Sequence, residues 1–220
     1  HCYDCLYYNH SHGSTEDQPQ VLQSVGVTED GTPEIWNMFM EVNQRIRENR
    51  GWEFEIPGYP YTPVSEGRIL SYGDYDLETV GLKGHTYGQM GLYDRNHKIL
   101  FCADQVIDGI VPIVGTTYPD EHLLKGYFDS LEKLKHQYGD CLILPAHKEP
   151  IRDVKRVVDR IVFAYLDKTD LIKHILDHGH HRMTTKEVAC LAYGIDHVPG
   201  DQSEFIKLKM GISKSFACLE

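Results

Sequence analysis

The chain has 220 residues, of which 41% are hydrophobic and 25% are charged, as expected for a globular protein with a real core. Its 22 basic and 33 acidic residues give a net charge of −11, which disfavours binding to a phosphate backbone. The sequence contains neither an apolar run near the roughly 20 residues of a membrane helix nor a basic-then-apolar opening. We therefore expect no nucleic-acid partner and no membrane partner.

The six cysteines are scattered along the chain and do not form a disulfide framework. Cys102 and Cys141 lie inside apolar runs and are interpreted as buried free thiols, which fits a reducing, cytoplasmic location. Cys2 and Cys5 form a single CxxC motif. Since a structural zinc site usually needs four ligands, this motif alone is weak evidence for zinc or redox chemistry.

The first third of the chain predicts a loop at 10–17, a helix and a second loop. Residues 1 to about 30 are mostly polar, and Thr32-Pro33 then begins a helix that runs to about Asn49, with Thr as N-cap and Pro at the first helical position. Residues 51–67 are rich in Pro and Gly and predict a loop. Its aromatic residues are better suited to packing on the core than to lining a pocket: Trp52, Tyr59 and Tyr61.

Residues 67–145 predict a layered α/β domain. Four short strands lie between Gly67 and Asp104, and the polar turn at 94–97 joins the last two in a hairpin. Ile99–Ala103 is apolar without alternation, so we expect that strand to be covered on both faces. A helix at about 122–137 and a buried strand at 141–144 continue the pattern.

The chain becomes helical after Pro150. One helix is predicted from Asp153 to about His178, a second begins at the capping box Thr184–Glu187, and a third begins near Ser203. We therefore expect a first domain at 1–152 and a helical extension at 153–220, similar to the start of a winged-helix module. Acidic residues offset its lysines, which favours covering a site rim or a homo-oligomer contact over DNA binding.

Histidines gather at the end of the first of these helices. His174 and His178 have the i, i+4 spacing that can hold zinc. Histidines near a helix C-terminus are also favoured by the helix dipole while they stay solvated, and this second interpretation is the stronger.

Three residues of metal-ligand type follow apolar strands or lie in a glycine-framed turn. Asp104 is the first polar residue after the strand 99–103, and His147 lies three residues past the strand that ends at Leu144. His85 lies between Gly84 and Gly88, in a turn where the backbone must pass close to something. Since sites in α/β sheets gather at the carboxyl ends of strands, these side chains are candidates for one metal site. Two imidazoles and a carboxylate suit zinc, iron or manganese.

The segment from Val80 to Ile151 resembles the metallo-β-lactamase superfamily, the group that includes the glyoxalase II-like hydrolases. Gly84-His85-Thr86-Tyr87-Gly88 is similar to its G-H-T-P-G turn. The strand ending at Asp104 is similar to its strand ending in Gly-Asp, and Leu144-Pro145-Ala146-His147 to its strand ending in Pro-Gly-His. Tyr87 and Ala146 replace the usual Pro and Gly of those motifs.

This resemblance implies an α/β fold, part of an αββα sandwich with a helical C-terminal extension. It implies a zinc-type hydrolase with two metal ions, in which His85 binds the first ion, Asp104 bridges both and His147 binds the second. A metal-bound hydroxide would attack a small-molecule carbonyl substrate such as a thioester, ester, lactone or lactam. Asp104 is then the catalytic residue.

The H-x-H-x-D-H signature of that superfamily is not found in this sequence. His10 and His12 supply its first two histidines, without the Asp and the last His. Because the chain begins with His1, we expect it to be a truncated piece of a longer polypeptide that starts downstream of the signature. The activity of this piece alone is then in question.

Three hypotheses follow from the sequence. The first is a fragment of a metal-dependent hydrolase. The second is a non-catalytic scaffold or interaction module that keeps the fold but not a complete metal site. The third is a mononuclear site formed by His85, Asp104 and His147 alone, which predicts that Asp104→Ala abolishes metal binding.

Overall fold

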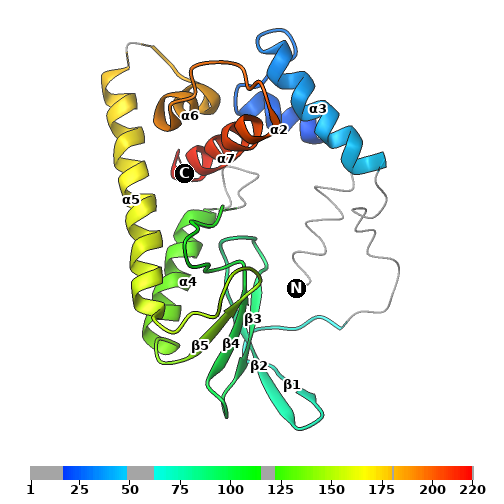
Figure 1. Ribbon diagram of the computed structural model, residues 1–220, viewed down its shortest axis with the longest axis vertical. Coiled ribbons are helices and arrows are strands. Elements are labelled where there is room, and N and C mark those ends of the chain that lie inside the picture. Colours follow the sequence, from blue (N-terminus) through cyan, green and yellow to red (C-terminus); the bar gives the residue numbers. More distant parts are fainter. Residues whose placement is uncertain (1–16, 49–61, 115–121, 180, 220) are drawn as a thin grey trace. The chain divides into compact units, whose positions relative to one another are not determined.

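A computed structural model describes residues 17–48, 62–114, 122–179 and 181–219 (Figure 1). Contacts divide the chain into two units, called here the sheet unit and the helical unit. Among the described residues, the sheet unit comprises 62–169 and 217–219, and the helical unit comprises the rest. The following predictions lie outside the described residues: Cys2 and Cys5, His10 and His12, and Trp52, Tyr59 and Tyr61.

The sheet unit contains a five-stranded sheet in the order β1-β2-β3-β4-β5 (Figure 1). Neighbouring strands are antiparallel except β4 and β5, which are parallel. The four strands and the hairpin predicted between Gly67 and Asp104 are confirmed. The strand bounds are β1 Ile69–Tyr72, β2 Tyr75–Gly81, β3 Met90–Asp94, β4 Ile99–Ala103 and β5 Leu142–Pro145.

The turn between β3 and β4 is organised by one carboxylate. Asp94 Oδ1 accepts the backbone N–H groups of Asn96 and His97 at 3.0 and 3.1 Å. Its Oδ2 lies 2.7 Å from Nδ1 of His97. The hydrogen bond from the His97 ring lowers the pKa of Asp94, so this carboxylate stays charged although the residue is buried.

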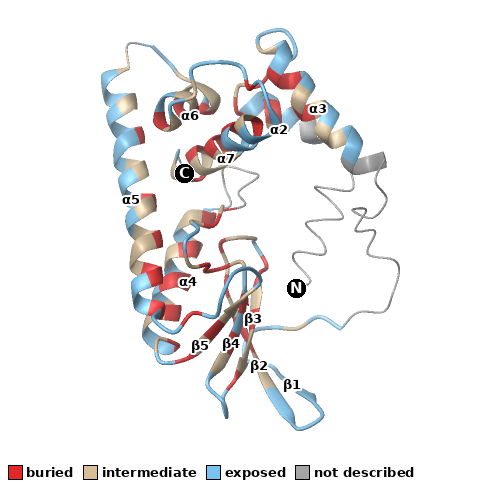
Figure 2. Cartoon of the chain, viewed as in Figure 1, coloured by how far each residue is buried: buried red, intermediate tan, exposed pale blue. Residues whose placement is uncertain are grey.

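Helices α4 (Leu123–Gln137) and α5 (Val154–His178) supply the core that covers one face of the sheet (Figure 2). Leu100, Cys102 and Ile143 are fully buried there with Tyr127. The strand β4 is not covered on both faces, contrary to its apolar sequence, because side chains alternate along a strand and Phe101 is 44% exposed. The free thiols predicted at Cys102 and Cys141 are confirmed, and both are buried.

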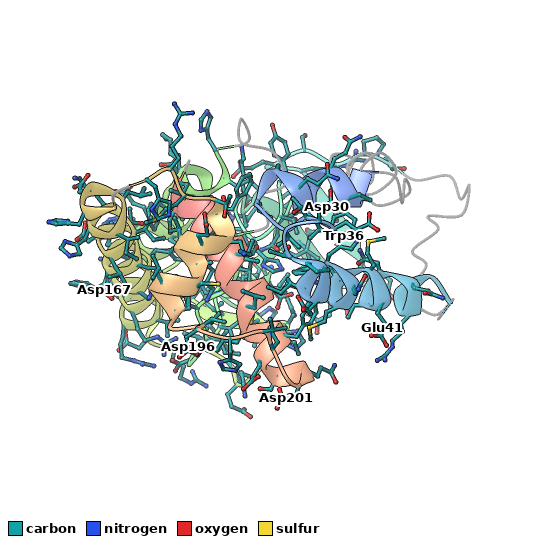
Figure 3. The ribbon with its side chains drawn as sticks, turned by 90° about the horizontal axis from the view of Figure 1, so that it is seen from above. Asp30, Trp36, Glu41, Asp167, Asp196 and Asp201 are labelled. Carbon is teal, nitrogen blue, oxygen red and sulfur yellow. The ribbon has the colours of Figure 1, made fainter. Side chains whose placement is uncertain are left out.

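The helical unit has its own hydrophobic core, which includes Trp36 (labelled in Figure 3). It contains α2 (Asp17–Ser24), α3 (Pro33–Glu48), α6 (Thr185–Tyr193), most of α7 (Gln202–Leu219) and the end of α5. Its buried residues include Leu22, Val27, Trp36, Phe39, Ala189, Phe205, Leu208 and Ile212. The helix beginning at Pro33 is confirmed. The helix α2 follows the loop predicted at 10–17 and was not predicted, because its polar sequence carries too few apolar residues to indicate a helix.

The capping residues predicted for the C-terminal helices are confirmed. The Thr184 hydroxyl accepts the Glu187 N–H, the Glu187 side chain accepts the Thr184 N–H, and Gly194 ends α6 in the left-handed conformation. The division predicted at residue 152, between a first domain and a helical extension, stays a prediction. The contacts group residues 154–169 of α5 with the sheet. None of the helices in the described ranges is long and apolar enough to cross a membrane.

Candidate metal centre

His85, Asp104 and His147 lie beyond the carboxyl ends of β2, β4 and β5. These three strands run in the same direction, so their ends meet at one edge of the sheet. The N–H of Ala146 donates to the carbonyl oxygen of Ala103 at 3.0 Å, which ties the two segments that carry Asp104 and His147. The structure therefore places all three predicted ligand residues together.

The Asp104 carboxylate lies between the two imidazoles. His85 Nε2 is 3.7 Å from Oδ2 of Asp104, and His147 Nε2 is 3.6 Å from Oδ1. Both distances are too long for a hydrogen bond. They are close to the ~3.5 Å that separates two donor atoms on one metal ion with bonds of about 2.1 Å. Each imidazole thus faces a different oxygen of one carboxylate.

One oxygen of the Asp104 carboxylate, Oδ1, is buried without a hydrogen-bond partner among the described residues. A buried polar atom without a partner is costly, and a bound cation would satisfy it. The donor set fits a divalent metal on this ground. In the same described part, no three His, Cys, Asp or Glu side chains form a closed metal-binding group, so the arrangement is a shared carboxylate with one imidazole at each oxygen.

The orientation of the His85 ring is set by a backbone carbonyl. Its Nδ1 lies 2.9 Å from the carbonyl oxygen of Ile113. A carbonyl oxygen only accepts, so Nδ1 carries the proton and the lone pair of the neutral ring is at Nε2, which faces Asp104. Ile113 was not singled out from the sequence, because any residue provides a carbonyl oxygen and only the path of the loop brings this one to His85.

The backbone next to each ligand residue takes a positive φ. The values are 148° at Gly84, 50° at Ala103 and 69° at Lys148. At Gly84, an added Cβ would lie 2.4 Å from Cδ2 and 2.7 Å from Cα of Tyr127, so only glycine fits. This is the close backbone approach predicted for the His85 turn. Left-handed conformations at non-glycine residues are strained and concentrate at functional sites.

Cys102 is the metal-ligand residue type nearest in sequence to Asp104, and its environment argues against a ligand role. Its side chain points into the core and is fully buried. Burial raises the pKa of the Cys102 thiol to about 12, so it stays protonated near neutral pH. Its Sγ lies near the backbone oxygen of Val106 at 3.8 Å, as expected for a structural thiol.

A surface cavity of about 440 Å³ lies beside the His85 turn. It is lined by Lys83, Tyr87, Gln89, Ser130 and Lys133 among others, but by none of the three ligand candidates. The Lys83 ammonium lies over the Tyr87 ring at 4.3 Å, and Lys133 pairs with Glu66. Because both cations already contact protein groups, the cavity does not by itself indicate an anion site.

Histidines at the end of α5 stack on each other and are exposed. The rings of His174 and His178 are 4.1 Å apart, and Nδ1 of His178 donates to the backbone oxygen of His174 at 2.9 Å. Because Nδ1 of His178 is used in that hydrogen bond, Nε2 is the ring nitrogen of His178 that could still bind a metal ion. The solvated interpretation is therefore the one that this geometry supports.

Proteins named acyl-coenzyme A thioesterases match a short segment of the chain. Acyl-coenzyme A thioesterase MBLAC2 of Gallus gallus is 43% identical over 53 residues, which are 24% of this chain and 19% of that protein. The protein of the same name from Homo sapiens is 33% identical over 63 residues, 27% of this chain and 23% of that protein. The matched segment thus spans about a fifth of each relative. No family model matches the chain.

Solved structures match much more of the chain. A β-lactamase domain protein from Burkholderia ambifaria aligns with 73% of this chain and 46% of its own, at 18% identity and a TM-score of 0.62. A metallo-β-lactamase family protein from Thermus thermophilus aligns with 82% of this chain and 58% of its own, at 19% identity and a TM-score of 0.60. The predicted α/β fold is thereby confirmed, and the chain has the metallo-β-lactamase fold.

Proposed function

We propose that this chain is the ligand-bearing portion of a metal-dependent hydrolase that acts on a small-molecule carbonyl substrate. One observation carries the proposal: a carboxylate with a buried, unpartnered oxygen lies between two imidazole nitrogens at 3.6 and 3.7 Å. The donor set of His85, Asp104 and His147 suits zinc, and iron or manganese would also accept it.

The residues of the chain have distinct tasks in this proposal. Ile113 holds the His85 ring so that Nε2 presents its lone pair, and Asp104 presents one oxygen on each side. The side chain of His147 is 69% exposed, so this imidazole faces the solvent from which a substrate would approach. A metal bound here would lower the pKa of a water molecule and polarise the substrate carbonyl.

Among carbonyl substrates we favour an acyl thioester, because the curated relatives are named acyl-coenzyme A thioesterases. In that reaction water adds to the thioester carbonyl carbon and the carbon–sulfur bond breaks. The sulfur leaves with the bonding electrons and takes up a proton, so the products are a carboxylic acid and a free thiol. Esters, lactones and lactams would react through the same addition to a carbonyl.

The test is the metal content of the purified chain, with Asp104→Ala as the matched variant. We expect near-stoichiometric zinc, iron or manganese in the wild type and a large loss in Asp104→Ala. With zinc added, the wild type should release thiol from a fatty acyl-coenzyme A faster than the variant. Equal metal content in the two proteins would contradict the proposed ligand role of Asp104.

A second candidate is a non-catalytic scaffold that keeps the fold. It is favoured by the lack of a closed three-ligand group in the described residues and by the exposure of Phe101 on the open sheet face. It predicts a chain that unfolds cooperatively but takes up no metal from a zinc titration. Zinc uptake that Asp104→Ala removes would exclude it.

A further inference from the structure

Gln105, the residue after Asp104, is completely buried and bonded at every polar group. Its N–H donates to the Cys102 carbonyl oxygen at 3.2 Å, closing a turn around Ala103 and Asp104. Its own carbonyl oxygen accepts the Tyr127 hydroxyl at 2.8 Å. Its side chain donates to the Lys83 carbonyl oxygen at 3.3 Å and accepts from Nε2 of Gln89 at 2.9 Å. The backbone beside Asp104 is thus held from several directions.

The chemistry of these partners determines which way the two amide side chains point. The Lys83 carbonyl oxygen only accepts, so the NH₂ group of Gln105 must face it. Its oxygen then faces Gln89, whose NH₂ group donates to it and also lies 3.4 Å from the Cys102 carbonyl oxygen. Only one orientation of the two amides therefore forms hydrogen bonds among all four groups, which are the two amide side chains and the carbonyl oxygens of Lys83 and Cys102.

This pair connects the two segments that carry His85 and Asp104. Lys83 lies two residues before His85, and its carbonyl oxygen is also bonded by the Ser130 hydroxyl at 2.8 Å. Gln105 therefore links the His85 turn directly to the residue after Asp104. The two ligand side chains do not bond each other at their 3.7 Å separation, so their spacing depends on such links between the backbones.

We infer that Gln105 is a positioning residue, which with Gln89 sets the spacing and alignment of His85 and Asp104 for a metal ion. This inference rests on the proposed function. Gln105 touches neither the metal position nor a substrate, since its side chain is occupied by Lys83 and Gln89. Its effect passes through the backbone, because its side chain holds the Lys83 carbonyl oxygen and its own backbone continues from Asp104.

The test compares zinc affinity, measured by chelator competition, in the wild type and in Gln105→Met, which has similar volume and no hydrogen bonds. We expect affinity to fall about tenfold, the lower end of the range for residues that orient ligands. Thr79→Val is the matched control. Thr79 is equally buried and donates to the Ser65 carbonyl oxygen at 2.6 Å, so its loss should lower stability without changing zinc affinity.

A double variant separates positioning from folding. Gln105→Met alone removes the acceptor that Gln89 Nε2 contacts at 2.9 Å and leaves it only the longer 3.4 Å contact with the Cys102 carbonyl oxygen. Gln89→Met/Gln105→Met removes both amides and should recover most of the lost stability. We expect its zinc affinity to stay low, because the link to Lys83 is still missing. Recovery of zinc affinity together with stability would overturn the inference, as would wild-type affinity in Gln105→Met.

A metal-free measurement distinguishes failure of this inference from failure of the proposed function. Ring ¹⁵N shifts of His85 should report a proton on Nδ1 in the wild type and in Thr79→Val. Gln105→Met loses the bond to the Lys83 carbonyl oxygen two residues before His85, so Nδ1 should no longer be held at the Ile113 carbonyl oxygen and a mixture of tautomers is expected. If the wild type takes up no zinc, the proposed function fails and the tautomers alone decide the inference. Identical tautomer populations in all three proteins would then overturn it.

Discussion

Nδ1 of His85 lies 2.9 Å from the carbonyl oxygen of Ile113, a residue 28 positions later in the chain. The segment that carries Ile113 is itself held by α5. The Tyr165 hydroxyl donates to the Pro112 carbonyl oxygen at 2.7 Å, and Arg160 donates to Asp108 at 2.9 Å. A helix outside the ligand motifs thus supports the loop that orients the first candidate ligand.

Tyr165→Phe should lower the free energy of unfolding by about 1–2 kcal/mol, because it removes the hydroxyl that satisfies the buried Pro112 carbonyl oxygen. Urea unfolding measures the change. Tyr72→Phe is the control, since Tyr72 is 82% exposed and its hydroxyl loss should change stability by less than ~0.5 kcal/mol. Equal effects in the two variants would show that the Tyr165 hydroxyl contributes nothing specific.

Gly84→Ala should be among the most destabilising single changes in the sheet unit, by about 3 kcal/mol. The added Cβ meets the Tyr127 backbone at 2.7 Å, and neither backbone can move freely. Gly73→Ala controls for backbone strain, because Gly73 also has a positive φ but no atom within 4 Å of its Cβ position, so about 1–2 kcal/mol is expected. Thermal unfolding of both variants checks the difference, and a Gly84→Ala protein as stable as Gly73→Ala would contradict the steric argument.

Ala103→Gly should stabilise the chain by roughly 1 kcal/mol. Ala103 has a φ of 50°, a left-handed conformation that strains any residue with a Cβ, and this relief exceeds the added freedom of glycine in the unfolded chain. Denaturant midpoints measure the gain. Ala192→Gly is the control, because Ala192 lies inside α6, where glycine should instead cost about 1 kcal/mol. A loss of stability in Ala103→Gly would mean that the strain is absent.

Stability of the helical unit should depend on pH through His197. This ring lies 2.8 Å from Asp196 (labelled in Figure 3) and 3.2 Å from Glu204. The hydrogen bond with Asp196, and then that with Glu204, raises the pKa of His197 above its usual 6.5. A raised histidine pKa stabilises the fold fully below about 6.5, and the contribution is lost as pH rises through the folded-state pKa.

At acid pH the two carboxylates change the stability of the helical unit in the opposite direction, because their contribution falls as the pH falls. The ring of His197 lowers the pKa of Asp196, and the Gly200 N–H, followed by His197, lowers that of Glu204. Stability from these carboxylates is lost as pH falls through their lowered pKa values. His197→Asn should therefore differ most from the wild type between about pH 5 and 6.5 and least above pH 8, in urea midpoints taken at low salt. A constant difference across that range would refute the assignment.

Two adjacent residues of β4 should respond differently to truncation. Leu100→Ala should cost about 2–5 kcal/mol, because Leu100 is fully buried under α4 and α5. Phe101→Ser should cost much less, about 1 kcal/mol, and should reduce self-association, because Phe101 is 44% exposed on the open face. Urea unfolding measures the stability of both variants, and sedimentation velocity measures the self-association of Phe101→Ser. A Phe101→Ser protein that self-associates as much as the wild type would show that the exposed face of the sheet plays no part in association.

Local signals in the sequence were sufficient for most elements of the fold. The turn at Asp94, the capping box at Thr184 and Glu187, and the stop at Gly194 act within a few residues, so sequence spacing alone identifies them. The three ligand candidates were also found from the sequence, because strand ends and a glycine-framed turn leave local marks. Their assignment as metal ligands stays a prediction.

Only the tertiary structure decided which groups surround those candidates. Whether Phe101 is covered depends on which face the helices occupy, and an apolar strand sequence does not contain that information. The same holds for Ile113 at His85 and for Gln105 between Lys83 and Gln89, since these contacts join residues 16 to 28 positions apart. Residue types and their spacing determined which side chains are candidate ligands. The packing of loops against helices decided which groups hold those side chains in place. Long-range contacts of this kind cannot be read from the sequence, because they leave no periodic pattern in it.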